Sequence, residues 1–195
     1  MNINSLLKPY PKKVRIKDGK EVILRPMEKG DARVLIRFFQ RIDENDRIYL
    51  RHDVTKKEVI EEWCNNINYE RVLPIMALNG GEVIGNSSLH RHGRHNWQEH
   101  VGQMRMVVSK EYRRRGLGII LAKEIFFLAF HTQLEILVAD MASEQETAIH
   151  FFTSLGFRQE AVLKNHIKDI NDCKQDLMIL TQSVDALWEK YLRST

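Results

Sequence analysis

EYRRRGLG, residues 111–118, joins a strand-like segment to a long apolar helical pattern that starts at its glycines. The first backbone N–H groups of a helix have no partner inside the helix, and the helix dipole is positive there. Gly116 and Gly118 carry no side chain, so the backbone can approach an anion closely. The stretch therefore predicts a phosphate-binding loop, whereas Arg113, Arg114 and Arg115 alone could be a solvated charge run or a nucleic-acid patch.

The spacing of the glycines separates this loop from two common phosphate loops. It lacks the Gly-x-x-x-x-Gly-Lys-Ser/Thr pattern of a Walker loop, and it lacks the longer Gly-x-Gly-x-x-Gly fingerprint. The spacing Arg113-x-x-Gly116-x-Gly118 matches Gln/Arg-x-x-Gly-x-Gly/Ala instead. In this it resembles the acetyl-CoA pyrophosphate loop of the GNAT N-acetyltransferase superfamily.

The segments around the loop predict a mixed α/β sheet. LEILVAD at 134–140 is typical of a short strand buried on both faces, and the unit spanning 100–140 predicts a parallel, right-handed strand–helix–strand crossover. Ser143 and Glu146 predict a capping box for the next helix, which should stop at Gly156. The other predicted elements are strands within 14–26, helices beginning near Asp31 and after Thr55, a hairpin at Asn79–Gly80–Gly81, two strands within 159–182, and a terminal helix capped by Ser183.

The order of these elements extends the resemblance over residues 14–181. FFTSLGF at 151–157 looks like the superfamily's Tyr-x-x-x-Gly-Phe, and VILRPMEKGDARVL at 22–35 is similar to its first strand and helix. The resemblance implies one acetyltransferase-like domain over 1–195, with a C-terminal helix at 183–193. Its fold would be α/β (α+β), with a mixed, mostly antiparallel sheet, a splayed parallel strand pair and flanking helices.

The resemblance also implies where acetyl-CoA, the cosubstrate, would bind. In the family the pantetheine arm lies between two splayed strands, which correspond here to 100–109 and 134–140. The backbone from Arg113 to Ile119 would cradle the pyrophosphate, and either Arg114 or Arg115 could reach the adenosine 3′-phosphate. The implied cofactor-binding residues are Met106, Val108, Arg113, Arg114, Arg115, Gly116, Leu117, Gly118, Ile119, Gln145 and Phe152.

The implied reaction is direct transfer of an acetyl group to an amine of a small molecule or a protein. A primary ammonium has a pKa of about 10.4, so it must lose a proton before it attacks the thioester. Glu99 and His100 are the candidate bases, since Gln103 cannot act as one, although each could equally be a turn or strand-end residue without a chemical role. The backbone N–H of Met106 is the candidate donor to the oxyanion.

Two residues depart from the family pattern. Gln145 stands where relatives often carry an asparagine that touches the cofactor. Phe152 occupies the place of the tyrosine that often protonates the leaving thiolate, and a phenyl ring has no proton to donate. The second departure supports an alternative function, a non-catalytic acyl-CoA-binding sensor or regulatory module of the same fold.

The composition is that of a packed protein with little excess charge. Of 195 residues, 43% are hydrophobic and 29% charged, and the formal net charge is +4, which is mild for a nucleic-acid binder. No apolar run approaches the ~20 residues of a membrane span, and the start does not resemble a secretory signal. We therefore expect a cytoplasmic protein that binds neither nucleic acid nor membrane, with a solvated basic segment at 8–20.

Metal and disulfide sites are not expected. Cys64 and Cys173 lie far apart in the sequence, and the histidines at 90, 92, 95 and 100 have no fixed ligand spacing. The terminal helix, with Leu187, Trp188 and Tyr191, could pack on the core or form the interface of a homodimer.

Overall fold

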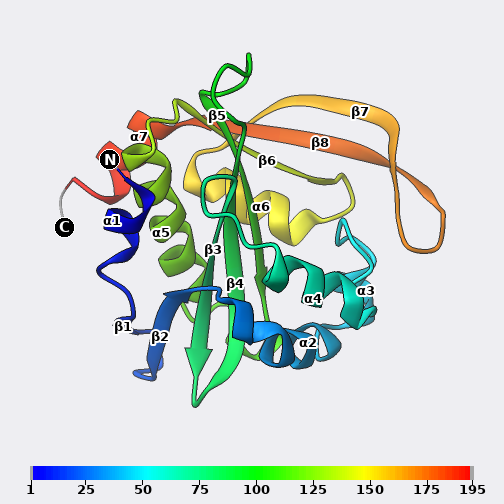
Figure 1. Ribbon diagram of the computed structural model, residues 1–195. Helices are drawn as coiled ribbons and strands as arrows, with labels where there is room; N and C mark the ends of the chain where they lie inside the picture. Colours follow the sequence, from blue (N-terminus) through cyan, green and yellow to red (C-terminus); the bar gives the residue numbers. More distant parts are fainter. Residues whose placement is uncertain (1, 194–195) are drawn as a thin grey trace.

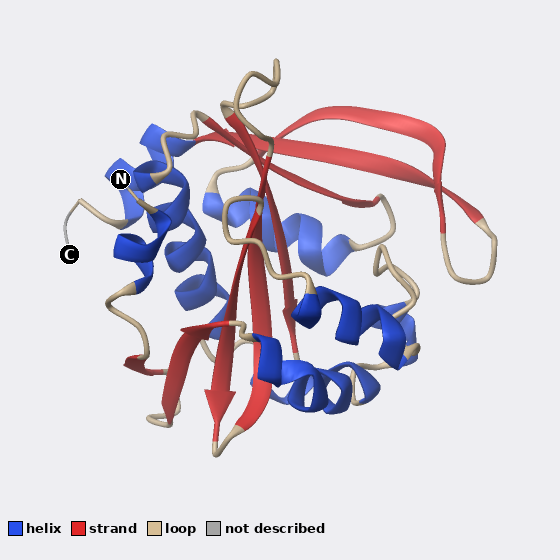
Figure 2. Ribbon diagram, viewed as in Figure 1, coloured by secondary structure: helices blue, strands red, loops and turns tan. Residues whose placement is uncertain are grey.

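The computed structural model describes residues 2–193 and has one eight-stranded sheet, in the order β1-β2-β3-β4-β5-β6-β8-β7 (Figures 1 and 2). Neighbouring strands are antiparallel except β5 and β6, which are parallel. The mixed, mostly antiparallel sheet with one parallel pair is therefore confirmed. The strands are β1 Lys12–Arg15, β2 Glu21–Pro26, β3 Val72–Asn79, β4 Glu82–Arg91, β5 Val101–Val108, β6 Ile136–Ala142, β7 Arg158–Lys168 and β8 Lys174–Ser183.

Helices cover both faces of this sheet. The α-helices are α1 Ile3–Leu7, α2 Ala32–Gln40, α3 Glu44–Arg47, α4 Lys57–Asn65, α5 Leu117–His131, α6 Glu146–Leu155 and α7 Val184–Tyr191, and the short 3-10 turns are η1 Lys29–Asp31 and η2 Lys110–Tyr112. Buried residues of α1, α5, α6 and α7 form one apolar cluster with the sheet. Those of α2 and α4 form a second cluster, and in Figure 1 these two helices lie away from α5 and α7.

Local chemistry explains several of the predicted boundaries. Gly80 and Gly81 both have positive φ, 59° and 83°, which the tight turn between β3 and β4 requires. Gly156 ends α6 in the left-handed conformation, with φ 108°. Ser183 caps α7, because its side chain accepts a hydrogen bond from the backbone N–H of Ala186.

The predicted solvated segment at 8–20 is mostly exposed, but Lys12–Arg15 within it form β1, and the helix before it, α1, packs on the core. Ile3 and Leu6 of α1 are 5% and 2% exposed and belong to the larger core cluster. Lys12 begins β1, and its ammonium pairs with Glu124 of α5 at 2.6 Å, while the Tyr10 hydroxyl donates to the same carboxylate. The segment is ordered because its apolar residues find a buried face beside the sheet.

Two other expectations are corrected. The capping box at Ser143 is absent, because the Ser143 hydroxyl donates to the carbonyl of Asp176 and α6 starts after Gln145 instead. In β6, Leu137 and Ala139 are buried, but Val138 and Asp140 on the other face are only half-buried. That face is open because it borders the cleft described below.

Neither a membrane span nor a metal cluster is found in residues 2–193. No helix there is both long and apolar enough to cross a bilayer. No group of three or more metal-ligating side chains gathers there either. Cys64 is a buried free thiol and Cys173 an exposed one.

Candidate functional site

The parallel strands β5 and β6 separate partway along their length. They pair only at Val101–Ile136, Gly102–Leu137 and Gln103–Val138. Beyond that point β5 stays paired with β4 as far as Val108, and β6 stays paired with β8 as far as Ala142. A wedge therefore opens between two strands that are each held on their outer side.

Glycines shape both ends of this wedge. At the closed end, a Cβ on Gly102 would lie 2.5 Å from the Leu134 side chain, so a larger residue would force the packing between β5 and the segment before β6 to shift. At the open end, the nearest neighbours of Gly118 are the Phe151 ring of α6 and the Met106 sulfur of β5, at 3.2 Å and 3.8 Å from a built Cβ. The first turn of α5 thus meets the wedge directly.

The loop before α5 presents a row of unused hydrogen-bond donors. Among the described residues, no protein acceptor is found for the backbone N–H groups of the six residues 114–119. Arg114 and Gly116 have positive φ, 58° and 84°, and alternate with residues of negative φ. Such alternation turns successive N–H groups toward one concavity, which suits an anion. The donors and the helix dipole fit a diphosphate.

The three arginines of the loop have different surroundings. Arg113 donates through Nε to the Val108 carbonyl at 3.1 Å and through Nη2 to Asp46 at 2.7 Å. Arg115 pairs with Asp18 at 2.6 Å, and this hydrogen bond holds the pKa of the Asp18 carboxyl below its usual range. Arg114 is exposed, and its side chain has no partner in the described chain. Arg113 and Arg115 therefore fasten the loop, and Arg114 is free to reach a ligand.

Other residues that the sequence predicts to bind the cofactor lie around the same end of the wedge. Leu117 is fully buried in the core and Ile119 is 37% exposed, both in the first turn of α5. Gln145 lies at the start of α6, where its Oε1 accepts from the backbone N–H of Ala142 at 3.1 Å. Phe152 is only 6% exposed and contacts the rings of Phe151 and Phe157 edge-on.

Glu99 and His100 are not brought to the open wedge. The Glu99 carboxylate caps its own loop by accepting the backbone N–H of His95 at 2.8 Å. The carbonyl of His100 accepts from the backbone of Glu135 and Ile136, beside the closed end. Glu99 and His100 both lie in the turn before β5, and residues 101–105 of the strand separate them from Met106, which is roughly 15–20 Å at the usual rise.

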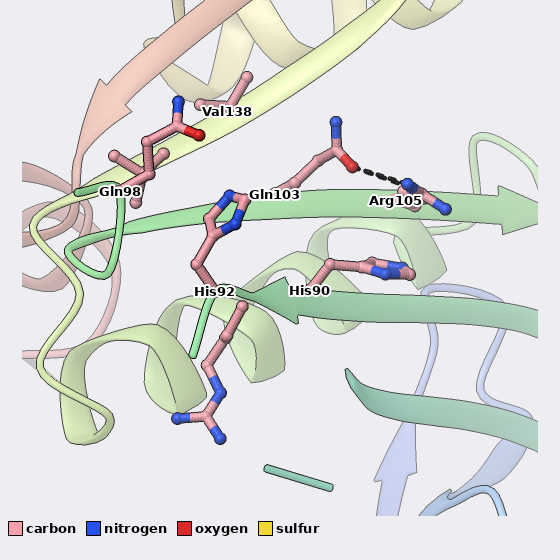
Figure 3. Close-up of a pocket in the computed structure, with 8 residues that line it drawn as sticks. His90, His92, Gln98, Gln103, Arg105 and Val138 are labelled. Carbon is pink, nitrogen blue, oxygen red and sulfur yellow. Dashed lines mark hydrogen bonds between the residues drawn. The ribbon is translucent and has the colours of Figure 1, made fainter. Parts of the chain in front are cut away.

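A cleft lies on the face of the sheet opposite α5. A cavity of about 410 Å³ is lined by residues from β4, β5 and β6, including His90, Gln103, Arg105 and Val138 (Figure 3). A second cavity of about 370 Å³ lies beside it, and Arg105 lines both. The second is lined by the segment before α4 and by the β7–β8 hairpin, through Tyr49, Arg51, His52, Asp169 and Gln175.

A polar chain crosses the floor of this cleft. Gln103 donates through Nε2 to Asp140 Oδ2 at 2.9 Å, and its Oε1 accepts from Arg105 Nη2 at 2.7 Å. Arg51 pairs with the same Asp140 oxygen. The other oxygen, Asp140 Oδ1, is buried and has no hydrogen-bond partner in the described chain. The carboxylate thus has one unsatisfied acceptor, which is covered from solvent.

The charges in the cleft act on each other. Burial, together with the charges of Arg105 and Arg51, lowers the pKa of His90 to about 3, so this imidazole is neutral at physiological pH. Its Nε2 lies 2.9 Å from the Ser88 hydroxyl. Burial also lowers the pKa of Arg105 to about 10, and the charge of Arg51 contributes to the shift. Arg105 nevertheless stays protonated at neutral pH.

Sequence reasoning missed most of these cleft residues. One signal was present, since Asp140 is the single charged residue of the otherwise apolar strand β6. Alternation along 101–108 also places positions 103 and 105 on one face. Arg51 had no such signal, because its segment carries no periodic pattern.

Comparison with known proteins gives a family and a fold. The sequence profile described as the acetyltransferase (GNAT) family matches residues 36–157, more than half of the chain. Among curated proteins, none matches the chain by sequence.

Several solved structures share the fold. The GNAT domain of PAT from S. lividans has a TM-score of 0.73 and 16% identity, covering 88% of this chain and 96% of that one. A GNAT-family acetyltransferase from Streptococcus pneumoniae has a TM-score of 0.71 and 20% identity, covering 83% of this chain and 99% of that one. A ribosomal-protein-alanine N-acetyltransferase from Brucella melitensis has a TM-score of 0.69 and 19% identity, covering 82% of this chain and 98% of that one. Identities this low carry the fold and not the substrate.

Proposed function

The chain belongs to the acetyltransferase (GNAT) family, and on this premise we propose that it moves an acetyl group directly from acetyl-CoA to an amine. One observation carries the proposal, namely the row of unpaired N–H groups at residues 114–119, which lies at the open end of the β5–β6 wedge. Backbone N–H groups at a helix start bind phosphate oxygens well. A diphosphate held there leaves the wedge free for the arm of the same cosubstrate.

Different residues would bind different parts of acetyl-CoA. Residues 114–119 would hold the diphosphate through their backbone, and the free Arg114 guanidinium would reach a further phosphate. Met106 and Val108 lie on β5 beyond its last pair with β6, so their backbone would border the arm. The Val108 carbonyl already accepts from Arg113, so we assign the larger part of this pairing to Met106.

The amine would enter from the cleft on the opposite face. Asp140 lies two residues beyond the last β5–β6 pair, and its buried Oδ1 lacks a hydrogen-bond partner in the described chain, so we propose that this carboxylate orients the ammonium and accepts its proton. Glu99 and His100 lie at the closed end and are weaker candidates. The nitrogen then bonds to the acetyl carbon as the C–S bond breaks. Phe152 has no proton to give, so we assign protonation of the leaving thiolate to water.

Thiol release tests the proposal. The protein is incubated with acetyl-CoA and a panel of amines that includes peptides, and free CoA thiol and the mass of each amine are followed. We expect thiol release that requires an amine, matched by an acetylated product.

Two other outcomes have distinct meanings. Tight CoA binding without release above background for any amine would support the alternative, a sensor or regulatory module that holds acyl-CoA. The absence of CoA binding would contradict both.

A further inference from the structure

We propose that the acceptor is a small amine that also carries a carboxylate, with Arg105 and Arg51 binding the carboxylate and Asp140 the ammonium. This inference rests on the proposed function and specifies the acceptor class for the same site. Two observations support it: a guanidinium without an ion-pair partner, and the spacing of the two kinds of charge.

The Arg105 guanidinium has no anionic partner in the described chain. Its Nε and Nη2 both donate to the neutral Oε1 of Gln103, at 3.2 Å and 2.7 Å. It contacts no carboxylate, although it is half-buried and lines both cavities. A buried charge without a counter-charge is costly, so an anionic ligand would relieve an existing penalty.

The carboxylates near Arg105 are each engaged with other groups. Asp140 is already paired with Arg51, so two guanidinium groups share one carboxylate. Asp169 accepts hydrogen bonds from the backbone of Asn171 and Cys173 and from the Gln175 amide, so the turn of the hairpin uses it. Lys168 pairs with Asp172 outside the cleft, and the His52 ring packs edge-on against Trp63. Asp169 keeps its negative charge, so these groups balance overall, but no carboxylate of the described chain forms an ion pair with Arg105.

Geometry matches the unpaired guanidinium to an amine with a nearby carboxylate. A single carboxamide, that of Gln103, bonds to Asp140 at one end and to Arg105 at the other, and Figure 3 shows Gln103 and Arg105 beside His90. An anionic and a cationic site thus lie one side-chain amide apart, a spacing that an amino acid's ammonium and carboxylate can span. Guanidinium groups also bind carboxylates in a two-pronged manner.

The same charges disfavour other acceptors. A polyamine would bring extra positive charge toward Arg51 and Arg105, and like charges repel strongly where water is scarce. A peptide N-terminus has an amide in place of the α-carboxylate, so it would leave Arg105 unpaired. Sites that bind a polar group of the substrate discriminate strongly against analogues that lack it.

The test compares three amines that share one side chain: the amino acid, its carboxamide, and the amine without the carboxyl carbon. At saturating acetyl-CoA we expect kcat/KM for the acid to exceed that of the amide by at least about 10-fold. Arg105→Gln should lower kcat/KM for the acid by a similar factor and change the amide by less than about 2-fold. Arg105→Lys keeps the charge but loses the two-pronged geometry, so its kcat/KM for the acid should lie between those of the wild type and Arg105→Gln.

Controls separate recognition from folding. Arg33→Gln, at an exposed arginine of α2, should leave both substrates unchanged. Each variant is checked for its melting temperature and for CoA binding. Titration calorimetry of the acid against the CoA-loaded protein gives an activity-independent readout, in which Arg105→Gln should weaken binding of the acid but not of the amide.

The outcomes distinguish the two proposals. Equal kcat/KM for acid and amide, or a peptide that outperforms the acid, would overturn the carboxylate inference and leave the acetyltransferase proposal standing. CoA binding without acetylation of any amine would instead overturn the acetyltransferase proposal.

Discussion

Gly116 and Gly81 have nearly the same backbone conformation, with φ 84° and 83°, but different surroundings. A Cβ on Gly81 would meet nothing within 4 Å. Gly116 belongs to the candidate phosphate loop, and a Cβ there would lie 3.3 Å from the Lys17 side chain. Valine at either position should cost about 1–2 kcal/mol of stability, because side chains disfavour positive φ. We expect only Gly116→Val to weaken CoA binding, by at least about 10-fold, as measured by calorimetry. Equal CoA affinity in the two variants would refute the cradle.

His90 should make stability depend on pH. Its folded-state pKa is about 3, held there by burial and by Arg105 and Arg51, whereas an unfolded histidine titrates near 6.5. Between these values the unfolded chain binds a proton that the folded protein does not, so stability falls as pH drops from about 6.5 toward 3. One proton gives a slope of at most about 1.4 kcal/mol per pH unit.

The measurement is urea unfolding from about pH 7 to about pH 4.5. We expect His90→Gln to flatten this pH dependence by up to that slope, and the exposed His92→Gln to leave it as in the wild type. An unchanged slope in His90→Gln would mean that the imidazole is protonated in the folded state.

At the scale of single residues, sequence could identify the loop but not the roles within it. The partners of Arg113 and Arg115 lie 67 and 97 residues away, so nothing local marks Arg114 as the free one. The same holds for Arg51, which meets Asp140 across 89 residues. Long-range ion pairs depend on how the finished sheet brings segments together.

Among the elements, the closed end of the wedge depends on Gly102. A Cβ there would lie 2.5 Å from Leu134 and 3.0 Å from Leu89, and both leucines are buried in the packed core. We expect Gly102→Ala to destabilise the protein by about 1–3 kcal/mol, because a packed core resists added volume.

Gly30→Ala is the matched control, since it has open space around the built Cβ and no positive φ. It should change stability by less than about 0.5 kcal/mol in the same chemical denaturation experiment. Equal losses in the two variants would show that the strands do not need this close approach.

Element types followed from periodicity and turn residues, and the misses have local causes. LEILVAD is apolar enough for a strand buried on both faces, but the separation of β5 and β6 exposes one face of β6. Ser143 and Glu146 have the spacing of a capping box, yet the Ser143 hydroxyl donates a hydrogen bond to the Asp176 carbonyl of β8. In both cases a neighbouring strand overrode the local pattern.

For the molecule as a whole, the N-terminal helix α1 should matter for stability. Leu6 is 2% exposed in the core cluster that also contains α5 and α7. Leu6→Ala should cost about 2–5 kcal/mol, as is usual for a buried leucine. Ser5→Ala, at an exposed neighbouring position, should cost less than about 0.5 kcal/mol. A melting temperature unaffected by Leu6→Ala would mean that α1 is not part of the cooperative core.

The order of the elements across the molecule was predictable, and the candidate acceptor cleft was not. The cleft takes side chains from β4, β5, β6, the segment before α4 and the β7–β8 hairpin. No sequence pattern spans so many separate segments. The candidate phosphate loop could be predicted because all of its backbone N–H groups come from one contiguous stretch.

The two sides of the wedge differ in what a substitution can alter. On the α5 side the proposed grip consists mainly of backbone groups, which most substitutions outside the two glycines of the loop would leave in place. On the other side it consists of side chains such as Arg51, Gln103 and Arg105, each replaceable by a single codon change. A lineage could therefore exchange one acceptor for another while the donor grip is inherited intact, and an engineer could follow the same route.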